Sequence, residues 1–253
     1  MSDDTGPRTL REWVEWFRTT DEGAVVWVRE VVTSAGAVLA VGLLLFAISG
    51  VWPPMVAVES SSMHPNMNTG DLVFVMEEHR LSPEFATAET GVVTYQTGER
   101  EGYTKFSAPG DVIIYRPDNR SGTPIIHRAR FWVDDGENWY DRANRSYVGS
   151  ADNCNELRYC PAPHAGFITK GDNENTNRRY DQVNGLSPPV RPGWVVGTAE
   201  VGIPLVGYVK LCASSGPCPL TATAAPGAPP ATVDPAPAFE ASARPANATA
   251  VAG

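Results

Sequence analysis

The most restrictive feature of the chain is a run of 28 residues without a formal charge, between Glu30 and Glu59. Within it, residues 33–52 are almost all apolar, and about 20 such residues suffice for one helix to cross a bilayer. A core helix of a soluble domain would show polar residues at helical spacing, and a cleaved secretory signal starts with a short basic segment. We therefore expect an uncleaved transmembrane anchor over residues 31–54, with the prolines at 53–54 ending the helix.

The basic residues on either side of this run predict its orientation. Four arginines precede it, at positions 8, 11, 18 and 29, whereas the next basic residue after it is Arg80. The positive-inside rule then leaves residues 1–30 in the cytoplasm and sends the chain from about residue 55 outside the cell membrane. The sequence thus predicts a single-pass membrane protein with an extracytoplasmic domain.

The cytoplasmic segment contains large apolar side chains at helical spacing, at Leu10, Trp13, Trp16 and Phe17. Two interpretations stay open for this segment. It is either a short helix lying on the membrane surface or a plain amphipathic helix that packs on its neighbours.

The C-terminal end has a different composition. Between residues 213 and 253, 22 of 41 residues are Ala or Pro, and large apolar side chains are rare. Such a segment cannot bury enough surface to offset the entropy lost on ordering, so we expect a disordered external tail. Three glycosylation triplets, at Asn119, Asn144 and Asn247, fit the external topology.

The remaining residues, 55–212, form a domain of ordinary size. The net charge of the chain is −9, and an acidic surface repels phosphates, which disfavours nucleic acid as a partner. Gly and Pro together account for 45 of 253 residues, and no long helical period is found in the domain. Short apolar or alternating runs bounded by turn residues predict strands instead. These runs cover residues 71–76, 111–115, 125–133, 167–170 and 194–199. We expect a mainly β chain with an antiparallel β catalytic domain behind one transmembrane helix.

Three polar blocks of this domain contain residues capable of chemistry. Residues 59–71 include three consecutive serines, residues 124–130 place His127 inside an apolar strand, and residues 169–175 are rich in Asp and Asn, with Asp181 beyond them. Taken singly, each block has an ordinary interpretation: a polar loop, a core histidine, and an Asx-turn.

Taken together, the order and content of the blocks resemble type I signal peptidase in its archaeal and endoplasmic-reticulum form. The nucleophile box of that family, Ser-Gly-Ser-Met-x-Pro followed by Gly-Asp, is similar to residues 60–65 and 70–71. Its second box, Gly-Asp with an apolar strand and then Ile-x-His-Arg, is similar to residues 110–115 and 125–128.

The resemblance extends over about residues 31–211. The third family box, Lys-Gly-Asp-Asn-Asn and a further Asp, is similar to residues 170–173 and Asp181, and a closing Val-Val-Gly and Pro-x-x-Gly to residues 195–197 and 204–207. The resemblance implies an antiparallel β peptidase domain that acts on secretory precursor proteins at the lipid bilayer and cleaves after small residues.

The chain also departs from the family pattern. Ser61 replaces the usual Gly, Glu174 replaces the second Asn of the third box, and the spacing from Asp172 to Asp181 is about three residues longer than usual. Residues 77–108 and 131–166 look like insertions. These departures put the assignment of the aspartate in doubt.

The resemblance and the chemistry of peptide hydrolysis assign the roles. Ser62 is the expected nucleophile and His127 its general base, because none of the three lysines, Lys105, Lys170 and Lys210, occupies the base position. A histidine base usually needs a carboxylate to orient it. The resemblance favours Asp181, and Asp172 is the alternative.

The resemblance also names the oxyanion donors, the backbone N–H of Ser62 and the hydroxyl of Ser60. Hydrolysis of this kind needs no cofactor and no metal. Since Ser62 follows the membrane face by only about ten residues, we expect the apolar residues 51–58 to insert into the outer leaflet. Met63 and Met67 either line substrate pockets or fill gaps in the core.

The cysteines form two pairs spaced six residues apart, Cys154 with Cys160 and Cys212 with Cys218. Zinc sites favour closer spacing, and disulfides form readily outside the cell, so we expect each pair to bridge locally, although four cysteines allow three connectivities.

Two other functions are compatible with parts of the sequence. A self-cleaving repressor-type serine peptidase would need a lysine base and no membrane span. A membrane-anchored, non-enzymatic β-rich binding module would make Ser62 a surface residue and His127 a core residue.

Overall fold

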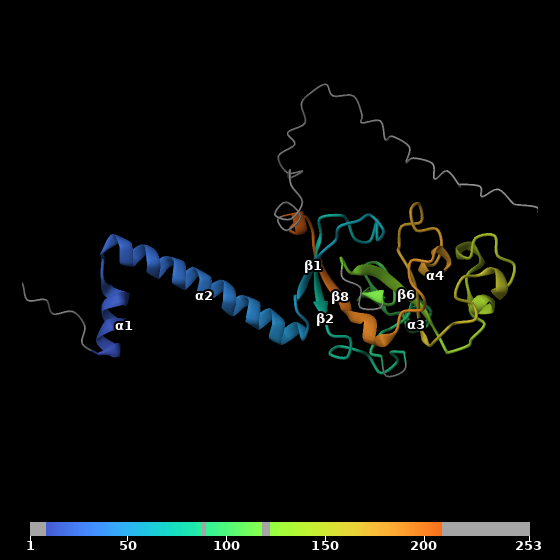
Figure 1. The fold of residues 1–253 in the computed structure, drawn as a ribbon, viewed down its shortest axis with the longest axis horizontal. Helices are drawn as coiled ribbons and strands as arrows, with labels where there is room; N and C mark the ends of the chain where they lie inside the picture. Colours follow the sequence, from blue (N-terminus) through green and yellow to red (C-terminus); the bar gives the residue numbers. More distant parts are fainter. Residues whose placement is uncertain (1–8, 88–89, 118–121, 209–253) are drawn as a thin grey trace, which may run out of the picture. The chain divides into compact units, whose positions relative to one another are not determined.

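The computed structural model describes residues 9–87, 90–117 and 122–208 (Figure 1). Predictions for the tail at 213–253, for Asn119 and Asn247, and for the pair Cys212 and Cys218 lie outside these residues.

Two helices precede the domain. Helix α1 spans Leu10–Thr19, and helix α2 spans Gly23–Ser49. Helix α2 is long and apolar enough to cross a membrane, as the charge-free run predicted. Its bounds differ from the expected 31–54, since the helix begins earlier, at Gly23. It also ends before the prolines, because Gly50 adopts a left-handed conformation at φ +80° and caps the helix.

A six-stranded antiparallel sheet forms the centre of the domain (Figure 1). Its strands pair in the order β1-β2-β8-β5-β6-β7. Its strands are β1 (Met55–Ala57), β2 (Leu72–Met76), β5 (Val112–Tyr115), β6 (Ile125–Val133), β7 (Gly166–Lys170) and β8 (Val195–Ile203). A separate hairpin pairs β3 (Thr104–Lys105) with β4 (Ala108–Pro109). The expected antiparallel sheet is confirmed.

Apolar residues explain which strands lie at the centre. All four residues of β5 and all five of β7 are buried, whereas β2 alternates between buried and partly buried positions along most of its length. The five predicted strand segments all contain a strand. Strand β1 was not predicted.

Strand β1 corrects one expectation. Residues 51–58 were expected to insert into the outer leaflet, but Val56, Ala57 and Val58 are buried in the domain core. The three residues of β1 pair with β2, which satisfies the backbone groups that face that strand. The apolar character of this segment therefore reflects core packing.

Helical segments accompany the sheet, so the described chain combines α and β structure. Helix α3 (Tyr95–Glu101) lies in the first predicted insertion, and the one-turn helix α4 (Asp181–Asn184) follows the third polar block. Four 3₁₀ turns occur at Trp139–Arg142, Arg145–Tyr147, Cys154–Glu156 and Pro192–Trp194.

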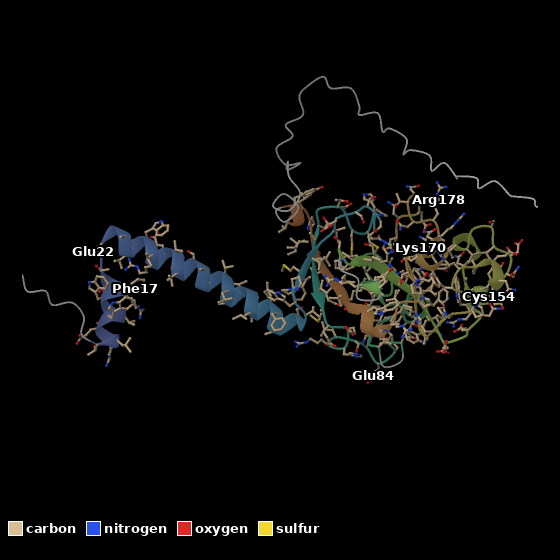
Figure 2. All side chains as sticks on the ribbon, viewed as in Figure 1. Phe17, Glu22, Glu84, Cys154, Lys170 and Arg178 are labelled. Atoms are coloured by element: carbon tan, nitrogen blue, oxygen red, sulfur yellow. A yellow bond between two sulfur atoms is a disulfide. The ribbon has the colours of Figure 1, made fainter. Side chains whose placement is uncertain are left out.

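The second predicted insertion packs on the sheet around aromatic side chains. Trp139 and Phe131 are both buried and in contact with Tyr180. Cys154 and Cys160 form the predicted disulfide within this insertion (Figure 2). The bridge and the aromatic cluster hold a long loop in one conformation beside the start of α4.

The end of α2 is joined directly to the sheet. The hydroxyl of Ser49 donates to the carbonyl oxygen of Val75 in β2 at 2.7 Å. Arg80 Nη1 donates to the carbonyl oxygens of Ala47 and Ile48, at 2.7 and 3.0 Å, and so satisfies carbonyls that have no partner inside the helix. These contacts attach the C-terminal end of α2 to the strand that follows the serine block.

Candidate active site

The serine block forms a turn that two methionines anchor in the core. Met63 and Met67 are 0% and 1% exposed, and the amide of Met67 donates to the carbonyl oxygen of Met63. Ser62, next to the first anchor, remains half-buried at the surface of this turn. Met63 both fills the core and lines the adjacent pocket, while Met67 belongs to the core.

The third polar block holds this turn from the other side. The backbone amide of Asn173 donates to the carbonyl oxygen of Ser62 at 2.9 Å, and its side-chain amide donates to that of Ser61 at 2.8 Å. Gly171 makes the close approach possible, since a Cβ there would lie 2.6 Å from the carbonyl oxygen of Ser62. The third polar block thus holds the backbone of the serine turn in one conformation, although the two blocks lie about 110 residues apart in the sequence.

His127 lies in the third position of β6, where it pairs with Ile113 of β5. It is only 4% exposed, yet it lines the same pocket as Ser62. Its Nδ1 atom lies 2.7 Å from Oδ2 of Asp181. With Nδ1 carrying the proton toward the carboxylate, Nε2 is left as the proton acceptor.

Asp181 is buried at the start of α4, where it is 1% exposed. Besides His127, its Oδ2 accepts hydrogen bonds from the hydroxyls of Thr169 at 2.6 Å and Tyr115 at 3.1 Å. Burial by itself would raise the pKa of Asp181, but the charge and hydrogen bond of His127, together with the two hydroxyls, outweigh it and lower this pKa below its ordinary value. Asp181 is therefore a carboxylate at neutral pH.

Asp172, the other candidate, has a different partner. It forms a salt bridge with Arg128, whose Nε donates to Oδ1 at 2.9 Å and whose Nη2 donates to Oδ2 at 2.6 Å. Asn66 donates to the same carboxylate at 2.9 Å. Asp172 does not contact His127, so of the two aspartates only Asp181 is placed to orient the imidazole.

Arg128 connects the site to the β3–β4 hairpin. Its side chain is fully buried, and Nη1 donates to four carbonyl oxygens near the hairpin. These belong to Lys105, Ala108, Pro109 and Gly110, at distances of 3.0, 3.3, 3.3 and 2.7 Å. The salt bridge with Asp172 therefore fixes the relative positions of the second and third blocks.

A pocket of about 390 Å³ brings Ser62 and His127 together. Its other lining residues are mainly apolar and come from β1 and the serine block after it, the chain before and within β6, and the loops after β7: Ala57, Val58, Glu59, Ser60, Met63, Thr123, Pro124, Ile125, Ile126, Asn177 and Leu186. Within the described residues, no hydrogen bond joins Ser62 to His127.

Ser60 and Ser62 are in contact at the rim of this pocket. Their hydroxyl oxygens lie 3.1 Å apart, and the backbone N–H of Ser62 donates to the Ser60 hydroxyl over a long 3.5 Å. A weak bond of this length is easily exchanged for one to a substrate oxygen. The two expected oxyanion donors are thus neighbours.

Neither described lysine lines this pocket. Lys105 is paired with Glu200. Lys170 is buried, and its Nζ donates to Glu174 and to the carbonyl oxygen of Gly171, both at 3.0 Å (Figure 2). Both ammonium groups are engaged elsewhere, and His127 is the histidine that lines the pocket with Ser62 in the described part of the chain.

Sequence reasoning missed the polar residues behind the aspartate. Thr169 and Tyr115 donate to Asp181, and the amide of Gln182 contacts both the backbone N–H and the hydroxyl of Thr169. Burial and the charge of Asp181 raise the pKa of Tyr115 well above its ordinary value, so its hydroxyl remains a donor. No spacing rule links these residues, because two strands and a helix bring them together.

A second buried carboxylate, Asp111, lies just before β5. It accepts hydrogen bonds from the amide of Val93 at 2.7 Å and the hydroxyl of Tyr103 at 2.9 Å. Burial raises the pKa of Asp111 to about 6, because desolvation outweighs these two hydrogen bonds; Glu200 raises it further and Lys105 lowers it. Asp111 does not line the pocket and acts on the stability of the fold.

One group of side chains in the described part of the chain has the spacing of metal ligands. Ligand atoms of Glu77, Glu78 and His79 lie within 4.8 Å of one another in the turn after β2. None of the three lines the pocket beside Ser62.

Comparison of the chain with known protein families found no match, and comparison with curated proteins found none either.

Proposed function

We propose that the protein is a membrane-anchored serine endopeptidase that removes signal peptides from secretory precursors, with an external catalytic domain of the signal-peptidase type. The observation that carries the proposal is the buried hydrogen bond of 2.7 Å between Asp181 and His127, whose ring lines the same pocket as Ser62. A histidine that only filled the core would not need an ionised, buried carboxylate and an opening toward a serine.

The proposed reaction proceeds through an acyl-enzyme. The Ser62 hydroxyl attacks the carbonyl carbon of the scissile peptide bond and transfers its proton to His127 Nε2. Asp181 stabilises the imidazolium, and the Ser62 N–H and the Ser60 hydroxyl donate to the oxyanion. The imidazolium then protonates the leaving amine, and a water molecule activated by His127 hydrolyses the ester.

The pocket supports a short, apolar substrate segment. Its walls are built largely from aliphatic residues, including the buried Ala57 and Val58 near the edge of the sheet, where β1 has one neighbouring strand among the described residues. An extended peptide can pair with such an edge. The resemblance to signal peptidases adds the expectation of small residues at the cut.

The attachment of α2 to the sheet supports cleavage near the bilayer. Thirteen positions separate Ser49, the last residue of α2, from Ser62. Contacts from Val75 and Arg80 hold the end of α2 against the domain. If α2 crosses the cell membrane with its N-terminus in the cytoplasm, the pocket faces outside and close to the membrane, where signal peptides are cut.

The decisive experiment replaces Ser62 with Ala in the full chain. The purified protein, reconstituted in vesicles, is incubated with a secretory precursor, and cleavage is followed by gel electrophoresis. Ser62→Ala should abolish processing, whereas Ser61→Ala, an adjacent exposed hydroxyl, should retain it. Full processing by Ser62→Ala would overturn the proposal and favour the non-enzymatic binding module.

A further inference from the structure

Helix α1 has one apolar face on which, in the described chain, three side chains are exposed and one, Phe17, is half-buried. Leu10, Trp13, Val14 and Phe17 recur at i, i+3, i+4 and i+7 and so form a single stripe. Leu10 is 86% exposed, and Trp13 and Val14 are each 50% exposed. Trp16, beside this stripe, is also exposed, and an uncovered apolar area of this kind requires an explanation.

The helix is well formed despite this exposure. Thr9 and Glu12 form a capping box at its start, and Trp13 stacks on Phe17 with their ring centroids 5.6 Å apart. Two arginines and two glutamates cover the rest of the helix: Glu12 and Glu15 lie opposite the stripe, and the arginines at positions 11 and 18 lie on its flank. Their formal charges cancel, so attraction to anionic lipids is not the main source of binding.

Helix α1 is tied to the start of α2. Only three residues, 20–22, separate the helices, and Arg29 in α2 donates to the carbonyl oxygens of Phe17, Arg18 and Thr20 at 3.4, 2.7 and 3.3 Å. A cation at these carbonyls also satisfies the C-terminal end of α1. The C-terminal end of α1 therefore lies beside the first two turns of α2.

Those turns have the composition of a membrane interface. Trp27 is 67% exposed, and Arg29 and Glu30 are the last charged residues before the apolar run. Tryptophan and snorkelling arginine are typical of the headgroup level. Because Arg29 holds α1 at this level, the exposed stripe of α1 meets the boundary between headgroups and acyl chains.

We propose that α1 is an in-plane membrane anchor whose apolar stripe (Leu10, Trp13, Val14 and Phe17) inserts into the cytoplasmic leaflet of the bilayer. Its occupant is the lipid itself, held by apolar burial. The anchor restrains the tilt and rotation of α2 and thereby of the attached domain. The proposal rests on α2 crossing the membrane and is independent of the peptidase activity.

Site-directed spin labelling of the full chain tests this proposal. Single cysteines are introduced as Leu10→Cys, Trp13→Cys and Phe17→Cys on the stripe, and as Arg11→Cys and Glu15→Cys outside it. The background carries Cys212→Ser and Cys218→Ser, and the Cys154–Cys160 bridge is kept. Each labelled protein is reconstituted in phosphatidylcholine vesicles, and collisions of the label with oxygen and with a water-soluble nickel chelate are compared.

Membrane insertion predicts a periodic result. Labels at positions 10, 13 and 17 should collide mainly with oxygen, and labels at 11 and 15 mainly with the nickel chelate. Adding anionic lipid or salt should leave this pattern unchanged, because the charges of α1 cancel. Access of the nickel chelate to all five positions would overturn the proposal.

Two further outcomes distinguish the alternatives. If labels on the stripe are shielded from both reagents, α1 packs on protein, and the proposal is wrong. A label at Leu44→Cys in α2 serves as the depth control. If this label collides mainly with oxygen while the labels on α1 collide mainly with the nickel chelate, the in-plane anchor is overturned and the membrane-spanning role of α2 is not. Precursor cleavage by the same samples reports separately on the proposed peptidase function.

Discussion

Replacing Asp181 with Asn removes the charge beside His127 while nearly preserving the size of the side chain. When the imidazolium forms, its charge lies roughly 4 Å from that of the carboxylate, and at an effective dielectric constant of about 20 the attraction is about 4 kcal/mol. Each 1.4 kcal/mol is about a factor of ten in rate. The loss of this attraction therefore predicts a fall of about 10³-fold in kcat/KM.

The side-chain amide introduced by Asp181→Asn has a second effect on the rate. Its NH₂ group can donate to His127 Nδ1 and favour the wrong tautomer, an effect that brings the loss to about 10⁴-fold in a Ser-His-Asp protease. The assay measures kcat/KM with a fluorogenic precursor peptide in proteoliposomes, and thermal unfolding reports the folded fraction. Activity within tenfold of the wild type in a folded Asp181→Asn protein would refute the proposed triad.

Asp172→Asn is the matched control, since it makes the same chemical change in the neighbouring block. It leaves the fully buried Arg128 without its counter-charge, so we expect a loss of about 3–5 kcal/mol in unfolding free energy. The folded fraction should lose much less activity than Asp181→Asn. A larger activity loss for Asp172→Asn, with both proteins folded, would assign the orienting role to Asp172.

Three further predictions concern residues around the pocket and in the core. Ser60→Ala should lower kcat about 10²-fold with little change in KM, because one oxyanion donor is lost, while Ser61→Ala should not. Gly171→Ala should lower activity and should lower stability by about 1–3 kcal/mol, because the new Cβ would lie 2.6 Å from the carbonyl oxygen of Ser62. Gly193→Ala is the control: a Cβ there has nothing within 4 Å, so neither quantity should change in the same kinetic and unfolding assays. The pKa of Asp111 is raised on folding from 3.8 to about 6, so its contribution to stability is present at low pH and is lost as pH rises through 6. Denaturant titrations at pH 4 and pH 8 should therefore show a loss of about 2 kcal/mol in the wild type relative to Asp111→Asn, because the unfolded-state carboxyl is already partly ionised at pH 4. Equal pH dependence of the two proteins would contradict this assignment.

The strand pattern of the domain could be predicted because its signals are local. Residues 125–133 alternate and are bounded by turn residues, and β6 has the same bounds. Strand β1 was missed because three residues after a long apolar run carry no alternation of their own. Met55–Ala57 is a strand because it pairs with β2, and fourteen residues separate the two strands in the chain.

The end of α2 shows the same limit. The prolines at 53–54 were expected to stop the helix, but Gly50 stops it three residues earlier. The contacts that accompany this ending, from the Ser49 hydroxyl to Val75 and from Arg80 to the last turn, come from residues 26 and about 33 positions away. They depend on the packing of the domain against the helix end.

The choice between Asp172 and Asp181 illustrates what local sequence cannot decide. Asp172 lies in the third block and Asp181 shortly after it. The family resemblance favours Asp181 only by its place in the order of the motif along the sequence. In the folded chain, β6 carries adjacent residues on opposite faces, so that His127 and Arg128 point in different directions. Arg128 takes Asp172, and His127 is left with Asp181.

The sequence by itself determined the apolar N-terminal helix, the antiparallel strands and the residue types of the candidate site, because hydrophobic period, turn residues and chemical identity are properties of short segments. Only the tertiary structure decided which aspartate contacts His127, which hydroxyls lower the pKa of that aspartate, and that residues 56–58, shortly after helix α2, belong to the core. These features depend on strand register and close packing between segments up to about 110 residues apart, which no short segment contains.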